Sequence, residues 1–310
     1  MIAFGPVPSR RLGHSLGINN IPPKFCTYSC VYCQIGRTIN MENERREFYK
    51  IEKIIEDVEK KVKEARKIGE KIDHLTFVPD GEPALDINIG KEIGFLKNLG
   101  IKIAVITNGS LIWKRDVQND LCKADWVSLK VDAVSKEIWQ RIDRPHKSLD
   151  LEEILEGIAE FSKIFKGELT TETMLIKGIN DKYEEIKKIA SFLEKLKPYK
   201  SYISIPTRPP AEKWAVPANE HNINMAFQVF NERDIDAEYL IGYEGNAFAF
   251  TGNIEEDLLS ITSVHPMREE GVKELLKKAD ADWGVVEKLI RESKLMEVEY
   301  QGKKYYMRKI

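Results

Sequence analysis

The chain has 310 residues, of which 42% are hydrophobic and 32% charged, and 48 Lys plus Arg oppose 50 Asp plus Glu for a formal net charge of −2. A chain of this composition buries a full core, which excludes disorder as its main state. Its near-neutral charge provides no global attraction to nucleic acid or lipid. It lacks an apolar run of the roughly 18 residues that a membrane span needs, and it opens without a signal-peptide pattern, so we expect a cytoplasmic protein with no membrane partner.

Short β-branched segments alternate with charged amphipathic segments through the first two thirds of the chain. The predicted strands are residues 16–21, 74–78, 101–107, 126–132, 169–176 and 202–206. The predicted helices between them are residues 51–68, 87–99, 136–142, 151–165 and 183–196. Because such alternation builds parallel sheets, we predict an α/β fold, a partial (β/α)6 TIM-like barrel. An open doubly wound sheet would produce a similar pattern, so the alternation leaves that topology open.

A compact tail begins after Thr251-Gly252-Asn253. Helices are predicted at residues 255–261, 268–278 and 283–292, and two strands, 294–300 and 303–308, flank Gln301-Gly302. This order of helices and hairpin is typical of a winged helix. The sequence therefore predicts two domains, a barrel with a capping extension at residues 1–253 and a winged-helix-like domain at residues 254–310.

Three of the four cysteines lie together, in a C-x₃-C-x₂-C spacing that follows the first predicted strand. They are Cys26, Cys30 and Cys33, whereas Cys122 stands alone. A cluster of thiols in a cytosolic chain indicates metal or redox chemistry rather than disulfides. Structural zinc normally takes four ligands, whereas three thiolates suit an iron–sulfur cubane with one open iron. His14 is the nearest alternative fourth ligand, but a single histidine at no diagnostic spacing usually has a structural role.

This spacing, with Tyr32 directly before the last cysteine, resembles the signature of the radical SAM superfamily. The resemblance implies an enzyme, an oxidoreductase or modifying enzyme, in which the three cysteines hold a [4Fe–4S] cluster and S-adenosylmethionine (SAM) binds the open iron. In that family the reduced cluster breaks the sulfonium C5′–S bond of SAM, and the 5′-deoxyadenosyl radical then abstracts hydrogen from a substrate. It also implies a flavodoxin- or ferredoxin-like protein as reductant.

Further segments resemble the SAM-binding elements of that family and come in order at the carboxyl ends of the predicted strands, where parallel sheets bind ligands. The segment 80–83, Asp-Gly-Glu-Pro, resembles the family's Gly-Gly-Glu, which holds the methionyl ammonium, although Asp80 replaces the first glycine. On the fourth strand, Lys130 is expected toward the cofactor carboxylate, and on the fifth Glu172 takes the place of the ribose ligand. The full set of expected cofactor contacts is Tyr32, Gly81, Glu82, Asn108, Ser128, Lys130 and Glu172.

The opening segment 5–13, the Cys-Val-Tyr-Cys-Gln-Ile-Gly run and the segment 141–146 resemble one group of uncharacterised archaeal and bacterial radical SAM oxidoreductases. That group is related to the wyosine-forming tRNA enzymes. The wyosine enzymes carry extra cysteines for a second cluster, and this sequence has no such upstream group.

Basic residues beside the expected site are candidate substrate contacts that could gather a phosphate or carboxylate. They are Arg10, Arg11, Arg141, Arg144, His146 and Arg208. The alternative for each is a solvated or surface-paired side chain, which is the usual state of an arginine in a loop.

The predicted winged tail is compatible with several substrate classes. An RNA-modifying enzyme would use Tyr305 and Tyr306 for stacking and would place four basic residues of the tail against phosphates, namely Lys303, Lys304, Arg308 and Lys309. A peptide- or protein-modifying enzyme would dock its partner on the hairpin edge or in a helix groove. A small molecule is also a possible class of substrate, in which case the tail would serve only to cap the barrel. A non-catalytic nucleic-acid-binding protein is the weakest alternative, because it leaves the expected SAM contacts without a purpose.

Overall fold

The protein is described by a computed structural model that covers residues 2–242, 245–246 and 248–309. Its centre is one open sheet with the strand order β1-β2-β5-β6-β7-β8-β9-β10. The strands are β1 (Ala3–Ser9), β2 (Gly13–Ile18), β5 (His74–Phe77), β6 (Lys102–Thr107), β7 (Trp126–Lys130), β8 (Glu168–Met174), β9 (Lys200–Ser204) and β10 (Ala237–Leu240). All neighbours pair in parallel except β1, which is antiparallel to β2.

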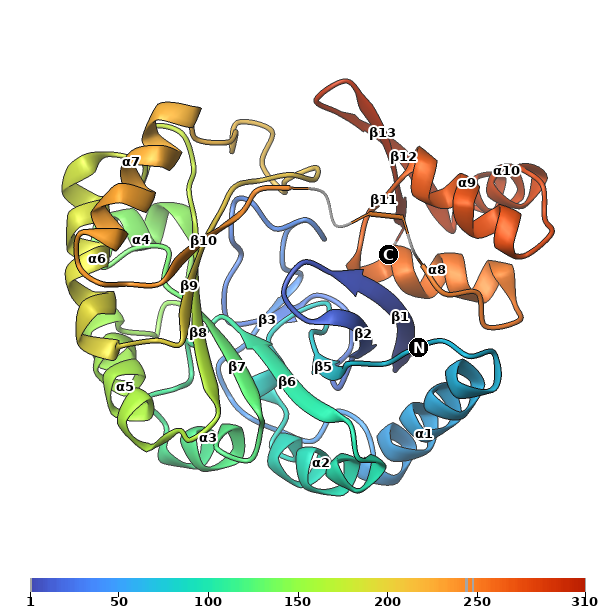
Figure 1. The fold of residues 1–310 in the computed structure, drawn as a ribbon, viewed down its shortest axis with the longest axis horizontal. Helices are drawn as coiled ribbons and strands as arrows, with labels where there is room; N and C mark the ends of the chain where they lie inside the picture. Colours follow the sequence, from blue (N-terminus) through green and yellow to red (C-terminus); the bar gives the residue numbers. More distant parts are fainter. Residues whose placement is uncertain (1, 243–244, 247, 310) are drawn as a thin grey trace.

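Helices cover the outer face of this sheet, which curves as in a partial barrel (Figure 1). They are α1 (Ile51–Lys67), α2 (Ile89–Leu96), α3 (Arg115–Leu121), α4 (Lys136–Ile142), α5 (Leu151–Ile164), α6 (Tyr183–Leu196) and α7 (Glu220–Asn231), with short 3₁₀ turns at Pro83–Leu85 and Lys97–Leu99. The predicted α/β class and its mostly parallel sheet are confirmed. The sequence prediction lacked β1, because its two prolines interrupt the usual pattern of a strand.

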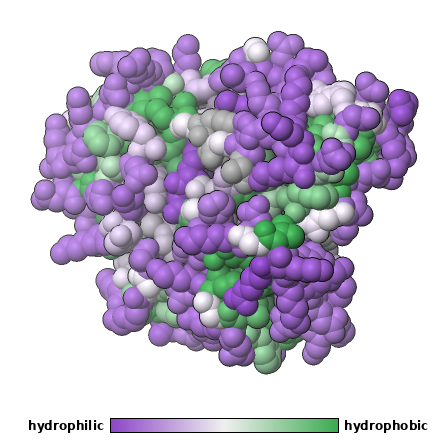
Figure 2. Space-filling view, turned by 45° about the vertical axis from the view of Figure 1, so that its right-hand side comes forward, coloured by the Kyte–Doolittle hydropathy of each residue, from purple (hydrophilic) through white to green (hydrophobic). Residues whose placement is uncertain are grey.

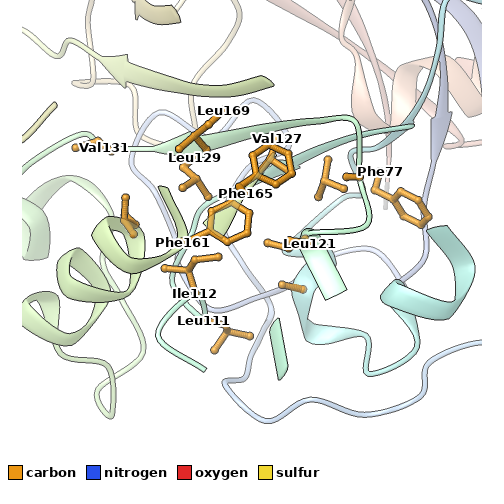
Figure 3. Close-up of a cluster of buried hydrophobic side chains, with 14 of the residues drawn as sticks. Phe77, Leu111, Ile112, Leu121, Val127, Leu129, Val131, Phe161, Phe165 and Leu169 are labelled. Carbon is orange, nitrogen blue, oxygen red and sulfur yellow. The ribbon is translucent and has the colours of Figure 1, made fainter. Parts of the chain in front are cut away.

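The alternation of side chains along β7 shows why this sheet has a polar inner face and an apolar outer face. Val127 and Leu129 point outward and are fully buried against the helices, where Phe161 and Phe165 of α5 stack with ring centroids 5.0 Å apart (Figure 3). Lys130, from the same strand, faces the cavity inside the barrel. The two-residue period of a strand thus builds the core on one side and leaves polar groups for a site on the other.

The tail packs against the first strand of the barrel. Its elements are α8 (Ile254–Val264), β11 (Met267–Arg268), α9 (Glu269–Lys278), α10 (Gly284–Arg291), β12 (Leu295–Tyr300) and β13 (Lys303–Arg308), and its strands form a sheet in the order β11-β13-β12. One apolar cluster joins Leu258 and Leu275 of the tail to Phe4 and Val7 of β1. The helices and the hairpin follow in the predicted order, while the winged-helix class and the boundary at residue 253 stay predictions.

The surface is mostly hydrophilic on the face shown in Figure 2, with small apolar patches between charged side chains. Within the described ranges, the helices are too short or too polar to cross a bilayer.

Two acidic side chains, Asp86 and Glu92, are fully buried between α2 and the segment before it. Burial, assisted by the negative charge of Asp86, raises the pKa of Glu92 from 4.5 to about 9. At neutral pH Glu92 is therefore protonated in the folded chain but ionised in the unfolded chain. Because the folded chain binds the extra proton, this group makes the protein less stable as pH rises from about 4.5 through about 9.

Replacing Glu92 by Gln should remove this pH dependence, since the amide is a neutral analogue of the protonated acid. We compare the free energy of unfolding of Glu92→Gln with that of the wild type. The difference, variant minus wild type, should increase between pH 5 and pH 8 by roughly 1.4 kcal/mol per pH unit at most. Urea denaturation at several pH values measures this, with Glu56→Gln on the exposed face of α1 as control. Parallel pH profiles for Glu92→Gln and the wild type would contradict it.

Candidate functional site

A cavity of about 300 Å³ opens at the carboxyl ends of the parallel strands. Its walls come from the loop that carries the three cysteines, here called the cluster loop (residues 24–39), from the ends of β5 to β8 and from the loop after β9. The predicted site residues that line it are Cys26, Cys30, Cys33, Tyr32, Gly81, Glu82, Asn108, Lys130 and Glu172. Ser128 lies beneath this lining, fully buried, with its Oγ 3.3 Å from Arg11 Nη1.

The cluster loop is fixed to the sheet by the segment that follows β5. The backbone N–H of Lys24 donates to the carbonyl of Asp80 over 2.7 Å, and the N–H of Glu82 donates to the carbonyl of Phe25 over 3.1 Å. A Cβ on Gly81 would overlap that same carbonyl oxygen of Phe25, so only glycine allows this approach. The two motifs found in the sequence are therefore joined by direct backbone contact.

The three thiols of the cluster loop are free and partly buried. Burial raises the pKa of Cys26 to about 12, with the nearby Glu82 carboxylate adding to the shift. Burial likewise raises the pKa of Cys30, where Asp143 adds to it. Because thiolates are the ligands of iron and are costly here without a positive partner, this donor set fits a positively charged iron–sulfur core with three protein ligands.

Tyr32 connects the cluster loop to the end of β7. Its hydroxyl donates to Asp132 and lies 3.5 Å from Oδ1 of Asp143. The thiol of Cys30 donates to the same Asp143 oxygen over 3.4 Å, and the ammonium of Lys130 lies 4.9 Å from the centre of the Tyr32 ring. The aromatic residue of the motif thus orients the loop through two buried carboxyl groups while its ring faces the cavity.

Glu82 is held by three donors from two segments. It accepts from the N–H of Ala84 at 2.9 Å, from the hydroxyl of Thr107 at 2.6 Å and from the N–H of Asn108 at 2.8 Å. Burial raises its pKa to about 7 in spite of these donors. The amide of Asn108 also donates to Thr27 Oγ1 and lies 3.6 Å from Cys26 Sγ, which connects β6 to the cluster loop.

Glu172 carries a firmly held negative charge inside the barrel. It accepts from Lys130 Nζ at 2.9 Å, from Arg11 Nη1 at 2.6 Å and from Ser204 Oγ at 2.9 Å. Burial alone would raise its pKa, but the charges of Lys130 and Arg11 outweigh burial and hold the pKa of Glu172 well below its usual range. A carboxylate offers about four acceptor sites, so one is left for a ligand hydroxyl.

Three of the predicted substrate contacts line the cavity. Arg10 donates to the carbonyl oxygens of Leu240, at 2.6 Å, and Gly242, at 2.9 Å, which join it to the end of β10. Arg11 pairs with Glu172, and Arg208 donates to Gln34 Oε1 over 2.5 Å. These arginines are fixed within the walls of the site.

The other candidates lie outside this lining. Arg144 pairs with Glu212 at 2.6 Å and lies over the ring of Trp214, and Arg141 is exposed on α4. The ring of His146 lies 2.8 Å from the hydroxyl of Ser148.

His14, weighed above as an alternative fourth ligand, is the second residue of β2, and its Nδ1 lies 3.3 Å from Oδ2 of Asp73. The cluster loop follows the opposite end of that strand. The structure therefore places His14 with a carboxylate rather than with the thiols.

Sequence reasoning missed several residues of the site. Lys24 and Asp80 line the cavity. Their positions next to the two sequence motifs were the signal that could have identified them. Gln34 donates to the carbonyl of Val264 in α8 over 2.8 Å. The hydroxyls of Tyr300 and Tyr305 donate to the carbonyl oxygens of Pro206 and Thr207, in the loop after β9, over 3.1 and 2.9 Å. The tail thereby holds two loops of the cavity.

The tail tyrosines do not have the role expected from the sequence. Tyr305 is 2% exposed and Tyr306 1%, so neither ring is available to stack on a base. Consecutive residues of a strand face opposite sides of its sheet, so Tyr306 packs in the apolar cluster of the tail, whereas Tyr305 faces the other side, where its hydroxyl donates to the carbonyl of Thr207.

Replacing Gly81 by Ala should loosen the contact between the two motifs. The added methyl group must displace the Phe25 carbonyl, at a cost of about 1–3 kcal/mol of stability and with loss of reconstituted iron. Thermal unfolding and iron content measure both effects.

Gly94→Ala is the matched control, because nothing lies within 4 Å of a Cβ at that exposed helical position and alanine there should stabilise by up to about 1 kcal/mol. Full iron content in Gly81→Ala would contradict the role given to this contact.

Comparison with known proteins gives consistent results. A family model described as the radical SAM superfamily matches residues 20–193. The UPF0026 protein of Methanocaldococcus jannaschii is 53% identical over 100% of this chain and 96% of its own length. A probable dual-specificity RNA methyltransferase, RlmN of Thermotoga maritima, is 27% identical over 69% of this chain and 61% of its own. The structure of a radical SAM methyltransferase from Sphaerobacter thermophilus superposes with a TM-score of 0.55 and 17% identity, covering 73% of this chain and 66% of the other.

Proposed function

This chain belongs to the radical SAM superfamily, and on that basis we propose that it cleaves SAM at a [4Fe–4S] cluster held by Cys26, Cys30 and Cys33 and abstracts hydrogen from a substrate in the same cavity. Enzymes of this superfamily bind the cluster and SAM and take their electron from an external reductant. The observation that carries the proposal is the position of three free thiols on one wall of a cavity whose other walls are the predicted SAM contacts. We infer a flavodoxin- or ferredoxin-like protein as the electron donor.

The residues of the cavity have separate tasks in this chemistry. When bound and reduced, the cluster supplies the electron that breaks the sulfonium C5′–S bond of SAM. Gly81 brings the backbone after β5 close to the cluster loop, so that the cofactor lies against main-chain groups. Glu172, kept ionised by Lys130 and Arg11, accepts from a ribose hydroxyl. Together these fixed groups position the cofactor before the electron arrives.

Substitution of any one of the three cysteines should abolish product formation. We expect Cys30→Ala, after anaerobic reconstitution with iron and sulfide, to hold at least tenfold less iron than the wild type and to form no 5′-deoxyadenosine from SAM under dithionite. Cys122→Ala is the matched control, since this thiol ends α3, away from the cluster loop. Chromatography of the reaction and iron analysis give the result. Wild-type product formation by Cys30→Ala would refute the assignment of the cluster.

RNA is the substrate class that the similarity to RlmN favours, and the tail is where RNA would dock. We propose that the tail is a winged helix and that its exposed Lys303 and Lys309 contact phosphates. Lys304 is partly neutralised by Glu297, 2.9 Å away, and the buried tyrosines contribute no stacking. RNA binding would therefore depend on charge alone. A peptide or a small molecule is the substrate if RNA does not bind.

If RNA docks on the tail, its retention by the protein should fall steeply with salt and should depend on the two lysines. We expect the double variant Lys303→Glu, Lys309→Glu to bind total tRNA at least tenfold more weakly at low salt in a filter assay. Lys60→Glu on the exposed face of α1 makes a matched single-site control. Equal retention by all proteins, or none by the wild type, would rule out RNA docking on the tail.

A further inference from the structure

A surface beside the cluster loop, outside the cavity, carries exposed apolar and basic side chains. We call it the outer surface, and it consists of Arg37, Ile39, residues 144–147, Lys177 and residues 212–216. Ile39 is 68% exposed, Trp214 50% and Val216 39%. Large apolar side chains that are exposed together mark contact sites for partners. The outer surface is therefore a candidate docking site.

Ion pairs join the segments of the outer surface. The carboxylate of Glu212, a buried residue, accepts from Arg37 Nε at 2.8 Å and from Arg144 Nη1 at 2.6 Å. The guanidinium of Arg144 also lies 5.9 Å from the centre of the Trp214 ring. The cluster loop, the segment after α4 and the loop after β9 thus form one continuous surface.

The outer surface is positively charged, although the whole chain has a net charge of −2. Its one acidic residue is Glu212, and its basic residues are Arg37, Arg144, Lys147, Lys177 and Lys213. Lys213 directly precedes Trp214, and the N–H of Lys177 donates to the carbonyl of Val216 over 3.1 Å. Two exposed lysines therefore flank the exposed apolar residues. Such a surface attracts an acidic partner, and salt weakens the attraction.

The outer surface lies close to one of the three cysteines. The N–H of Ser29, which directly precedes Cys30, donates to the carbonyl of Arg144 over 3.2 Å. The thiol of Cys30 donates over 3.4 Å to Asp143, the neighbour of Arg144 in the chain. Cys30 lines the cavity, whereas the residues of the outer surface lie outside that lining. A partner on this surface would approach Cys30 while the cavity stays open to cofactor and substrate.

We propose that the outer surface is the docking site of the electron donor, and that this donor is an acidic one-electron carrier protein. The inference rests on the proposed function, which needs an external reductant. In the complex the reduced carrier loses one electron and the cluster gains it, and no covalent bond forms or breaks. Trp214 forms the apolar centre of the interface, and the basic side chains around it form the polar rim that is typical of interfaces. The exposed apolar side chains and the position outside the cavity favour a carrier protein over RNA.

The first test measures binding of an acidic flavodoxin and of an acidic ferredoxin to the anaerobically reconstituted protein. Fluorescence anisotropy of each labelled carrier gives its dissociation constant at low and at high salt. We expect the double variant Lys177→Glu, Lys213→Glu to bind the preferred carrier at least tenfold more weakly at low salt, with a smaller difference at high salt. The double variant Lys60→Glu, Lys63→Glu reverses two exposed charges on α1 and should bind like the wild type.

The second test compares two reductants in the formation of 5′-deoxyadenosine. The variant Lys177→Glu, Lys213→Glu should keep the wild-type rate under dithionite, which needs no docking, and lose at least tenfold with the reduced carrier. Trp214→Ala should show the same selective loss, and its weaker binding should persist at high salt because an apolar contact is not screened. Iron content confirms that each variant holds its cluster.

Several outcomes would overturn the inference. Carrier binding that is equal in the wild type and in Lys177→Glu, Lys213→Glu, or a wild type that binds neither carrier, would refute it. Loss of tRNA retention with carrier binding intact would assign the surface to RNA instead. Equal losses with both reductants would place the effect in the site of chemistry rather than in docking. A wild type that forms its cluster but does not cleave SAM under dithionite would refute the proposed function itself, which keeps the two failures distinct.

Discussion

The approach of the Gly81 backbone to the carbonyl of Phe25 is the contact on which the site depends. The cluster loop has little regular structure of its own beyond a two-residue ladder between β3 (Phe25–Cys26) and β4 (Asn40–Met41). Its position is therefore set by where it contacts the sheet. Because the segment after β5 is fixed by the parallel ladder, docking on it places the thiols over the carboxyl ends of the strands. A side chain at Gly81 would separate the cysteines from the other walls of the cavity.

The inner face of the barrel buries charged side chains, and pairing them reduces the desolvation penalty. Glu172 is nearly inaccessible to solvent, yet two cations and a hydroxyl stabilise its negative charge. Such a network stays ionised and rigid, since each member would be costly to leave unpaired. The thiols and Asp80 are the opposite case. Burial raises their pKa values, and the nearby positive charges are too few to offset the cost of ionising them. A site with this contrast is ready for a cationic cluster and a charged cofactor.

The tail is connected to the same cavity rather than attached at a distance. Gln34, next to the last cysteine, donates to the carbonyl of Val264, while Tyr300 and Tyr305 hold the loop after β9. Phe4 of β1 packs among the apolar side chains of the tail. Movement of the tail would therefore shift the cluster loop and the wall opposite it.

The sequence by itself determined the strand–helix alternation, the cysteine spacing and the motif positions, because these depend on periodicity and on neighbours a few residues apart. It also placed Lys130 on the inner face, since a strand alternates its side chains, while Glu172 was expected in the site from the resemblance to the radical SAM family. Only the tertiary structure decided which loop residues reach the cavity, bringing in Lys24 and directing Arg144 to Glu212 instead. It likewise buried Tyr305. Loop and tail side chains take their direction from distant packing, which no local pattern in the chain encodes.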